Sequence, residues 1–254
     1  MNEKNLIEYY NKFNEDKRLD TRHGIVEFTT ITKYIDKYLK GMDNPKVIDI
    51  GAGTGKYSDY IEKLGYDVTA IELVKHNLSC IKERNKNIKA YQGNALDLSR
   101  FEDNTFDLVL LFGPLYHLIS EEDKLKALSE AKRIVKPTGI IMVQYCLKDF
   151  AIIKHGFMDK TIKESNLDDN FNIISNPEDL YSFVTINEIN SYNEKLNLKP
   201  IKRINPEGLV EYMRSSINDL DEEEFELFLK YNLSICEQPE MLGFGRHLVD
   251  IITK

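Results

Sequence analysis

The sequence lacks the features that mark secreted or membrane-embedded proteins. Its three cysteines, Cys80, Cys146 and Cys236, lie far apart and form no C-x-x-C spacing, which argues against a disulfide framework or a cysteine-rich metal site. No apolar run approaches the roughly 20 residues that cross a bilayer, and the first residues, Met-Asn-Glu-Lys, do not open a signal peptide. We therefore expect a cytoplasmic protein with no membrane partner.

Dense clusters of lysine and arginine are also missing. The 254 residues carry 42 acidic and 34 basic side chains, a formal charge of −8. The excess is concentrated between Glu207 and Glu240, where ten acidic residues face only Arg214 and Lys230, and such runs are typical of solvated helical faces. Because a nucleic-acid binder needs a basic patch to neutralise phosphates, no nucleic-acid partner is expected.

The central third of the chain alternates short β-like runs with helical patterns. This alternation is typical of an α/β protein with a doubly wound, mostly parallel sheet. One helix is expected to begin after Ser120 and to end at Pro137-Thr-Gly139. The expected strands are 46–50, 67–72, 88–92, 106–112 and 140–145.

The segments that flank the central third do not show this alternation of strands and helices. Residues 1–45 are expected to form an N-terminal helical cap on a main domain that spans 46–254. Residues 150–182 show no clear period, and 207–240 carries two amphipathic helices, so both are interpreted as lid insertions that select the substrate. A helix over 185–197 and strand-like runs over 198–204 and 245–252 complete the chain.

A glycine-rich turn, Asp49-Ile-Gly51-Ala-Gly53-Thr-Gly55, follows the first strand. A phosphate-binding Walker loop is excluded, because Ile50 replaces its first glycine and Tyr57 its Ser or Thr. The dinucleotide fingerprint is weakened by Lys56, which stands at its last glycine. S-adenosylmethionine has no phosphates, and its methionine ammonium suits Asp49, whose carboxylate would repel a pyrophosphate. A purely structural tight turn is the remaining interpretation.

Glu72 ends the second strand, where a carboxylate can accept both ribose hydroxyls of a nucleoside. This placement suits NAD and S-adenosylmethionine equally, so Glu72 alone does not discriminate between them.

Four segments together resemble class I S-adenosylmethionine-dependent methyltransferases. They are Val47-Ile-Asp-Ile-Gly-Ala-Gly-Thr-Gly55, Glu72, Gly93-Asn-Ala-Leu-Asp97 and the strand that starts Phe106-Asp-Leu-Val-Leu. The resemblance implies a Rossmann-like, seven-stranded sheet with an antiparallel last strand, which 198–204 and 245–252 would supply as a hairpin. It also implies that Gly51, Gly53 and Gly55 contact the methionine part, Glu72 the ribose, Leu73, Asn94 and Ala95 the adenine, and Phe112 and Gly113 the region of the sulfur. Asn94 stands where an aspartate is frequent.

Two further segments resemble a bacterial subgroup of this family whose substrates are mostly unassigned. One is Phe112-Gly-Pro-Leu-Tyr-His-Leu118, which matches a G-P-L-Y-H-L signature. The other is N-terminal and contains Arg18-Leu, Arg22-His-Gly24 and Glu27-Phe28. Arg22 there is either a forked partner of the methionine carboxylate or an ordinary surface residue at a helix start.

The candidate catalytic residues are Tyr116 and His117. His117 acts either as a general base or as a brace that hydrogen-bonds a loop carbonyl, and Tyr116 either stacks on the acceptor or packs beneath a lid. The (Asn/Asp)-Pro-Pro-(Tyr/Phe) tetrad of enzymes that methylate adenine or glutamine nitrogens is absent, which favours a small-molecule acceptor. The other histidines have no second ligand at helical spacing, so no metal is expected.

The sequence therefore predicts an S-adenosylmethionine-dependent methyltransferase that acts on a small molecule. The alternatives are an S-adenosylmethionine-binding protein without turnover and an NAD(P)-linked reductase. The acceptor atom and the oligomeric state stay open.

Overall fold

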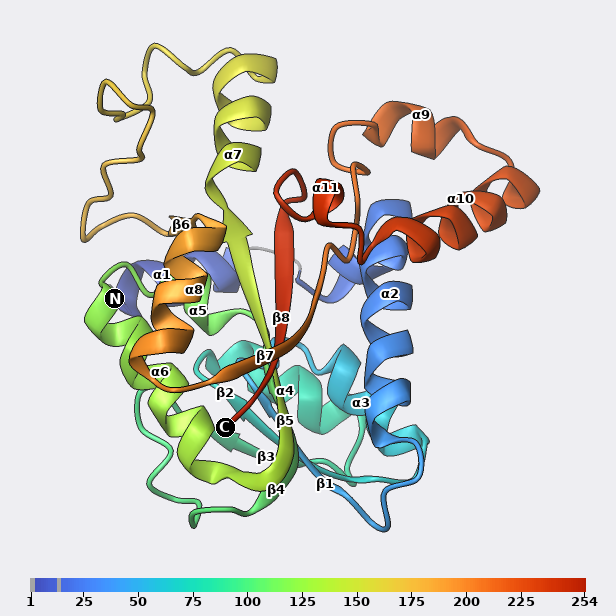
Figure 1. Ribbon diagram of the computed structural model, residues 1–254. Helices are drawn as coiled ribbons and strands as arrows, with labels where there is room; N and C mark the ends of the chain where they lie inside the picture. Colours follow the sequence, from blue (N-terminus) through green and yellow to red (C-terminus); the bar gives the residue numbers. More distant parts are fainter. Residues whose placement is uncertain (1–2, 13–14) are drawn as a thin grey trace.

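A computed structural model describes residues 3–12 and 15–254 of the protein (Figure 1). Over these residues a single sheet of eight strands has the order β3-β2-β1-β4-β5-β8-β7, and the short β6 pairs with β5. The strands are β1 Lys46–Ile50, β2 Asp67–Glu72, β3 Lys89–Gln92, β4 Phe106–Leu111, β5 Val135–Leu147, β6 Phe183–Val184, β7 Lys199–Ile204 and β8 His247–Thr253. The expected α/β class is confirmed, and β6 is an eighth strand that the sequence did not predict.

The parallel part of the sheet contains the point at which a ligand is expected to bind. β1 lies between β2 and β4 and runs parallel to both, with the helices α3 (Lys56–Lys63), α4 (Lys75–Arg84) and α6 (Glu121–Ile134) in the connections between successive parallel strands. The strand order reverses between β1 and β4. Open α/β sheets bind ligands at such a switch point, beyond the carboxyl ends of the strands.

The other edge of the sheet is the expected antiparallel hairpin. β8 pairs antiparallel with both β5 and β7. This arrangement brings the start of β8 beside the end of β5, with Cys146 opposite His247. Side chains from the last part of the chain therefore reach the same end of the sheet as the glycine turn.

The start of β5 differs from the prediction. Ser120 caps α6 as expected, because its side chain accepts a hydrogen bond from the backbone N–H of Asp123, but the helix ends at Ile134 and β5 begins at once. Its register against β4 shifts between the pairs made by Phe106 and Leu108. The Pro137-Thr-Gly139 stretch falls in this irregularity and interrupts the pairing rather than ending the helix.

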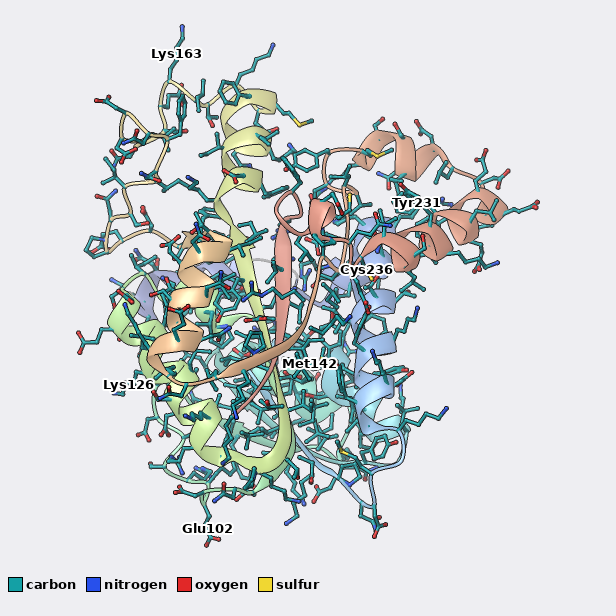
Figure 2. The ribbon with its side chains drawn as sticks, viewed as in Figure 1. Glu102, Lys126, Met142, Lys163, Tyr231 and Cys236 are labelled. Carbon is teal, nitrogen blue, oxygen red and sulfur yellow. The ribbon has the colours of Figure 1, made fainter. Side chains whose placement is uncertain are left out.

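Both faces of the sheet are covered, as Figure 1 shows: α6 and α8 (Ile186–Lys195) lie on one side and α2 (Arg22–Leu39), α3 and α4 on the other. In β4, Val109 and Leu111 pack toward the first group and Leu108 and Leu110 toward the second, and none of the four is exposed. Burial on both faces explains why this strand is almost wholly apolar. Figure 2 shows the buried Met142 in the middle of the molecule and the exposed Tyr231 far from it.

The segments outside the alternating core gather at one end of the sheet. The expected N-terminal cap divides into α1 (Glu3–Lys12), the 3-10 helix η1 (Glu15–Asp20) and α2, which is part of the sheet's cover. The 150–182 insertion contains α7 (Lys148–Ala151), which starts just before it, the π-helix η2 (Ile152–Met158) and a long irregular stretch. The second insertion holds α9 (Arg214–Asp219), α10 (Glu222–Ile235) and α11 (Pro239–Leu242).

Among the described residues, no helix is both long and apolar enough to span a membrane.

Candidate cofactor site and adjoining cavity

A cleft of about 990 Å³ of empty space lies at the carboxyl ends of β1, β2 and β4 and beside the residues that follow β3. Every predicted cofactor residue except Arg22 and Gly55 lines it: Asp49, Gly51, Gly53, Glu72, Leu73, Asn94, Ala95, Phe112 and Gly113. The two candidate catalytic residues, Tyr116 and His117, line it as well.

The glycine turn has the backbone that its sequence predicts. Gly51, Gly53 and Gly55 all have positive φ, at 74°, 57° and 82°, a region that glycine enters without steric cost. A Cβ on Gly51 would lie 2.6 Å from Cδ of Pro114. The glycine turn and the G-P-L-Y-H-L segment are therefore in direct contact, and Gly55, which caps α3, lies just outside the cleft.

The Glu72 carboxylate is preorganised at the bottom of the cleft. Its two oxygens each accept a backbone N–H, from Gly53 and from Val74, both at 2.8 Å. The Asn77 side chain is a third donor to this carboxylate, and the lone pairs that these bonds leave can accept hydroxyl groups. Burial raises the pKa of Glu72 to about 7, against the opposing effect of these hydrogen bonds. A nucleoside ribose, with two adjacent hydroxyls, fits this pair of oxygens.

Asp49 is the second buried carboxyl group of the cleft. It is 1% exposed and accepts a hydrogen bond of 2.7 Å from the Ser58 hydroxyl. Burial raises its pKa to about 6. A cation beside Asp49 would offset this desolvation, whereas a pyrophosphate would add to it.

The side of the cleft at Asn94, where the resemblance predicts the adenine, is closed by α1. Asn94 donates a hydrogen bond of 2.7 Å to Glu3, while its side-chain oxygen accepts the backbone N–H of Leu96. Leu6 and Tyr10 of the same helix line the cleft. Sequence pattern alone does not predict that these α1 residues line the cleft, since an isolated amphipathic helix does not reveal the surface it will cover.

His117 has both ring nitrogens engaged. Nδ1 lies 2.7 Å from the carbonyl oxygen of Leu180, so Nδ1 carries the hydrogen, and Nε2 accepts from the Tyr10 hydroxyl at 2.8 Å. Burial lowers the pKa of His117 to about 4. In this arrangement the imidazole is neutral and joins the G-P-L-Y-H-L segment to α1 and to the irregular stretch before β6.

Arg22 does not reach the cleft. Its guanidinium donates to the carbonyl oxygen of Leu220 at 2.7 Å and to Glu222 at 2.8 Å, and it lies 4.8 Å from the centre of the Phe225 ring. Arg22 therefore ties α2 to the segment between α9 and α10.

Arg18 lines the cleft instead. Its Nη1 is 2.6 Å from Glu27 of α2. Gly24 makes this approach possible, because a Cβ there would lie 2.1 Å from the carbonyl oxygen of Arg18. The two arginines are four residues apart, and only the path of η1 across α2 decides which of them faces the cleft.

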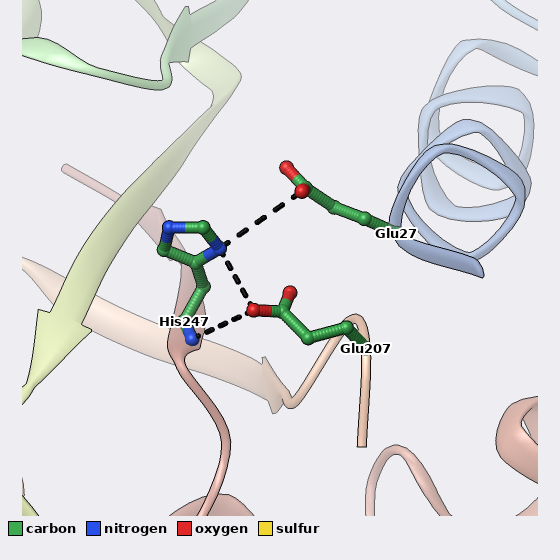
Figure 3. A group of neighbouring side chains, drawn as sticks. All are labelled: Glu27, Glu207 and His247. Atoms are coloured by element: carbon green, nitrogen blue, oxygen red, sulfur yellow. Dashed lines mark hydrogen bonds and ion pairs between the residues drawn. The ribbon is translucent and has the colours of Figure 1, made fainter. Parts of the chain in front are cut away.

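A buried ion network lies behind Arg18 (Figure 3). His247 Nδ1 is 2.9 Å from Glu207 and 4.0 Å from Glu27, and all three residues are buried. Burial disfavours the charged imidazolium, but Glu207 and Cys146 outweigh it and raise the pKa of His247 to about 10. These are metal-ligand residue types, and Arg18 and the protonated His247 balance the charge of the two carboxylates.

A second cavity, with about 1,480 Å³ of empty space, adjoins the cleft. Tyr10, Arg18 and Tyr116 line both spaces. The rest of its wall comes from Tyr9, Lys17, Thr21, His23, Cys146, Phe150, Lys154, His155, Asp159, Tyr181, Phe183, Glu211, Arg214, Arg246 and His247. Tyr116 stands between the two spaces and stacks on His247, with ring centres 5.8 Å apart.

Comparison with known proteins supports the fold. Residues 48–143 match the family described as "Methyltransferase domain". Demethylmenaquinone methyltransferase of Staphylococcus aureus is 31% identical over 139 residues, which cover 51% of this chain and 56% of that protein. The chain thus spans about half the length of these curated relatives.

Two solved structures share the fold over almost the whole chain. The PH0226 protein of Pyrococcus horikoshii has a TM-score of 0.62 at 16% identity and covers 97% of this chain and 98% of its own. An S-adenosylmethionine-dependent methyltransferase of Thermotoga maritima has a TM-score of 0.59 at 18% identity and covers 97% of both chains.

Residues 48–143 thus match a methyltransferase domain, and almost the whole chain shares its fold with solved proteins that include an S-adenosylmethionine-dependent methyltransferase. S-adenosylmethionine is the cofactor of such a domain, and the cleft's paired carboxyl groups and open glycine turn fit it.

Proposed function

We propose that the protein transfers the methyl group of S-adenosylmethionine to a small-molecule acceptor. The observation that carries this proposal is the junction of the cofactor cleft with a second cavity through Tyr10, Arg18 and Tyr116. A protein that only held the cofactor would need the cleft alone. The buried Asp49 carboxyl group beside the glycine turn disfavours the pyrophosphate of NAD(P) and thus the reductase alternative.

Bound S-adenosylmethionine supplies a methyl group on a positively charged sulfur. The methyl group passes to a nucleophile that lies in line with the departing thioether. The role of this chain is to hold the two reactants in that line, which is itself a large source of acceleration. Glu72 would orient the ribose and Asp49 the methionine ammonium. Phe112 and Gly113 would border the sulfur, with Tyr116 at the passage to the acceptor.

Calorimetric titration of the protein with S-adenosylmethionine, S-adenosylhomocysteine and NADH tests the cofactor. We expect the first two to bind and NADH not to bind. Phenols, amines and thiols are then screened for release of S-adenosylhomocysteine. Tight binding of NADH would contradict the proposal, and cofactor binding with no turnover on a broad panel would favour the binding protein without turnover.

We propose that Arg18, not Arg22, pairs with the methionine carboxylate. Because charge-assisted hydrogen bonds contribute about 1.5–3 kcal/mol and Arg18 already shares its charge with Glu27, Arg18→Gln is expected to weaken S-adenosylmethionine binding by about tenfold. Arg22→Gln should leave the dissociation constant unchanged and lower the melting temperature, since it removes the bond to Leu220. Equal affinities of the wild type and Arg18→Gln would contradict the assignment.

We further propose that His117 is a brace and not the general base. With a pKa of about 4 and both nitrogens hydrogen-bonded, the imidazole should stay neutral down to pH 5 in a ¹⁵N NMR titration of the histidine rings. His117→Gln should slow methyl transfer by less than about tenfold and keep the low-pH limb of the rate profile, whereas loss of a general base costs roughly 10²–10⁴-fold. If His117→Gln loses the low-pH limb, His117 is the general base and the proposal is wrong.

A further inference from the structure

The second cavity is positively charged although the chain as a whole is acidic. Five lysine and arginine side chains line it against the carboxylates of Asp159 and Glu211, and His247 adds a protonated imidazole. Glu27 and Glu207 balance Arg18 and His247 from behind the wall. A concave surface of one sign in a low-dielectric wall concentrates ligands of the opposite sign.

Arg246 is the cation best placed to bind such a ligand. It stands directly before β8, and its side chain is 26% exposed. Its contact with the Glu211 carboxylate is long, 3.4 Å from Nη1. Glu211 is held more closely by Arg214, at 2.6 Å. One carboxylate is thus shared by two guanidinium groups, and most of the Arg246 fork is left to face the cavity.

The remaining wall is aromatic. Phe150, Tyr181 and Phe183 line the cavity together with Tyr116, which stands at the passage to the cofactor cleft. The rings of Tyr116 and Tyr181 are 6.1 Å apart. A flat, apolar ligand body can pack against these rings from the cavity side, because aromatic groups gain from offset or edge contacts.

We propose that the second cavity takes a small aromatic carboxylate, with its carboxylate on the Arg246 guanidinium and its opposite end at Tyr116. A carboxylate matches the planar fork in a bidentate pair, and a single negative charge suits a cation that Glu211 partly neutralises already. Identifying this molecule as the methyl acceptor rests on the proposed function.

The wall of the second cavity lies almost wholly outside the segment that matches the methyltransferase domain. Of the residues that line the cavity, only Tyr116 falls within the matched segment 48–143. The other lining residues belong to the N-terminal segment and to the part of the chain after Val143, where Arg246 and Glu211 lie.

The test is a calorimetric titration of the S-adenosylhomocysteine-saturated protein with hydroxy-, amino- and mercaptobenzoates, each paired with its neutral carboxamide. We expect at least one acid to bind about tenfold more tightly than its amide, and Arg246→Gln to lose that difference. Glu211→Gln, which removes the competing carboxylate, should tighten the acid severalfold. Arg22→Gln is the control, an arginine outside the cavity, and should bind the acid as the wild type does.

The inference is overturned if no acid binds, if acids and amides bind alike, or if Arg246→Gln retains the preference. If Arg246→Gln does not fold, Glu211→Gln still tests the inference, because it is expected to bind the acid more tightly than the wild type. This test can fail independently of the proposed function. If the protein binds S-adenosylmethionine but shows no preference for acids, only this inference is contradicted. If the protein binds no S-adenosylmethionine but prefers acids when titrated without cofactor, only the proposed function is contradicted.

Discussion

Gly51→Ala is expected to weaken S-adenosylmethionine binding by about a hundredfold or more. Gly51 has a φ of 74°, and an added Cβ would lie 2.6 Å and 2.7 Å from two ring carbons of Pro114. The unfavourable φ costs about 1–3 kcal/mol and the overpacking a similar amount. The turn can relieve both only by moving, which displaces the main chain that faces the cofactor.

The chain offers a matched control for this substitution. Gly65 also has positive φ, at 92°, but a Cβ there would meet nothing within 4 Å. Gly65→Ala should therefore lower stability by about 1–3 kcal/mol, the cost of the unfavourable φ alone, and leave the dissociation constant unchanged in the same calorimetric titration. Pro114→Ala combined with Gly51→Ala should recover part of the affinity, because it removes the colliding ring. Full affinity in Gly51→Ala alone would show that the turn does not hold the cofactor.

Glu72→Ala is expected to weaken S-adenosylmethionine binding by about ten- to a hundredfold. The substitution removes the acceptor of two ribose hydroxyls, and hydrogen bonds to a charged group contribute about 1.5–3 kcal/mol. Asp67→Ala is the control, since Asp67 lies at the opposite, exposed end of the same strand. An unchanged dissociation constant in Glu72→Ala would refute the assignment of the ribose site.

The affinity should also depend on pH through Glu72. Its folded-state pKa of about 7 lies above the ordinary value of 4.5, because burial favours the protonated form. If the ionised carboxylate binds the ribose, affinity rises with pH through 7 and levels off above 8. Glu72→Gln should remove this rise and leave only the weaker dependence at lower pH that comes from Asp49, whose pKa is about 6. A pH dependence identical to that of the wild type would contradict the role of Glu72.

Sequence periodicity predicted strongly patterned elements well. The buried strand β4, the capped helix α6 and the hairpin of β7 and β8 were all expected. The helix α4 was not, because only Asn77 and Ile81 of its ten residues are buried and its polar sequence shows little periodicity. A crossover between the parallel strands β2 and β3 nevertheless requires such a connection.

Local sequence did not predict which neighbours meet. Arg18 and Arg22 are equally plausible partners for a carboxylate until the crossing of η1 over α2 at Gly24 turns one toward the cleft. His117 offers a titratable ring at the right strand end, but its two hydrogen bonds come from residues 107 positions before it and 63 after it.

By itself, the sequence determined the class of sheet, the glycine turn and the paired carboxyl groups, because those depend on residues close together in the chain: a buried strand, a positive φ and a strand end. Only the tertiary structure decided what lies across the cofactor cleft and what charge the second cavity carries. These depend on Arg18, Glu211 and Arg246, which come from three distant segments. The free energy of such contacts depends on burial and on distances of a few ångströms, and neither is encoded in spacing along the chain.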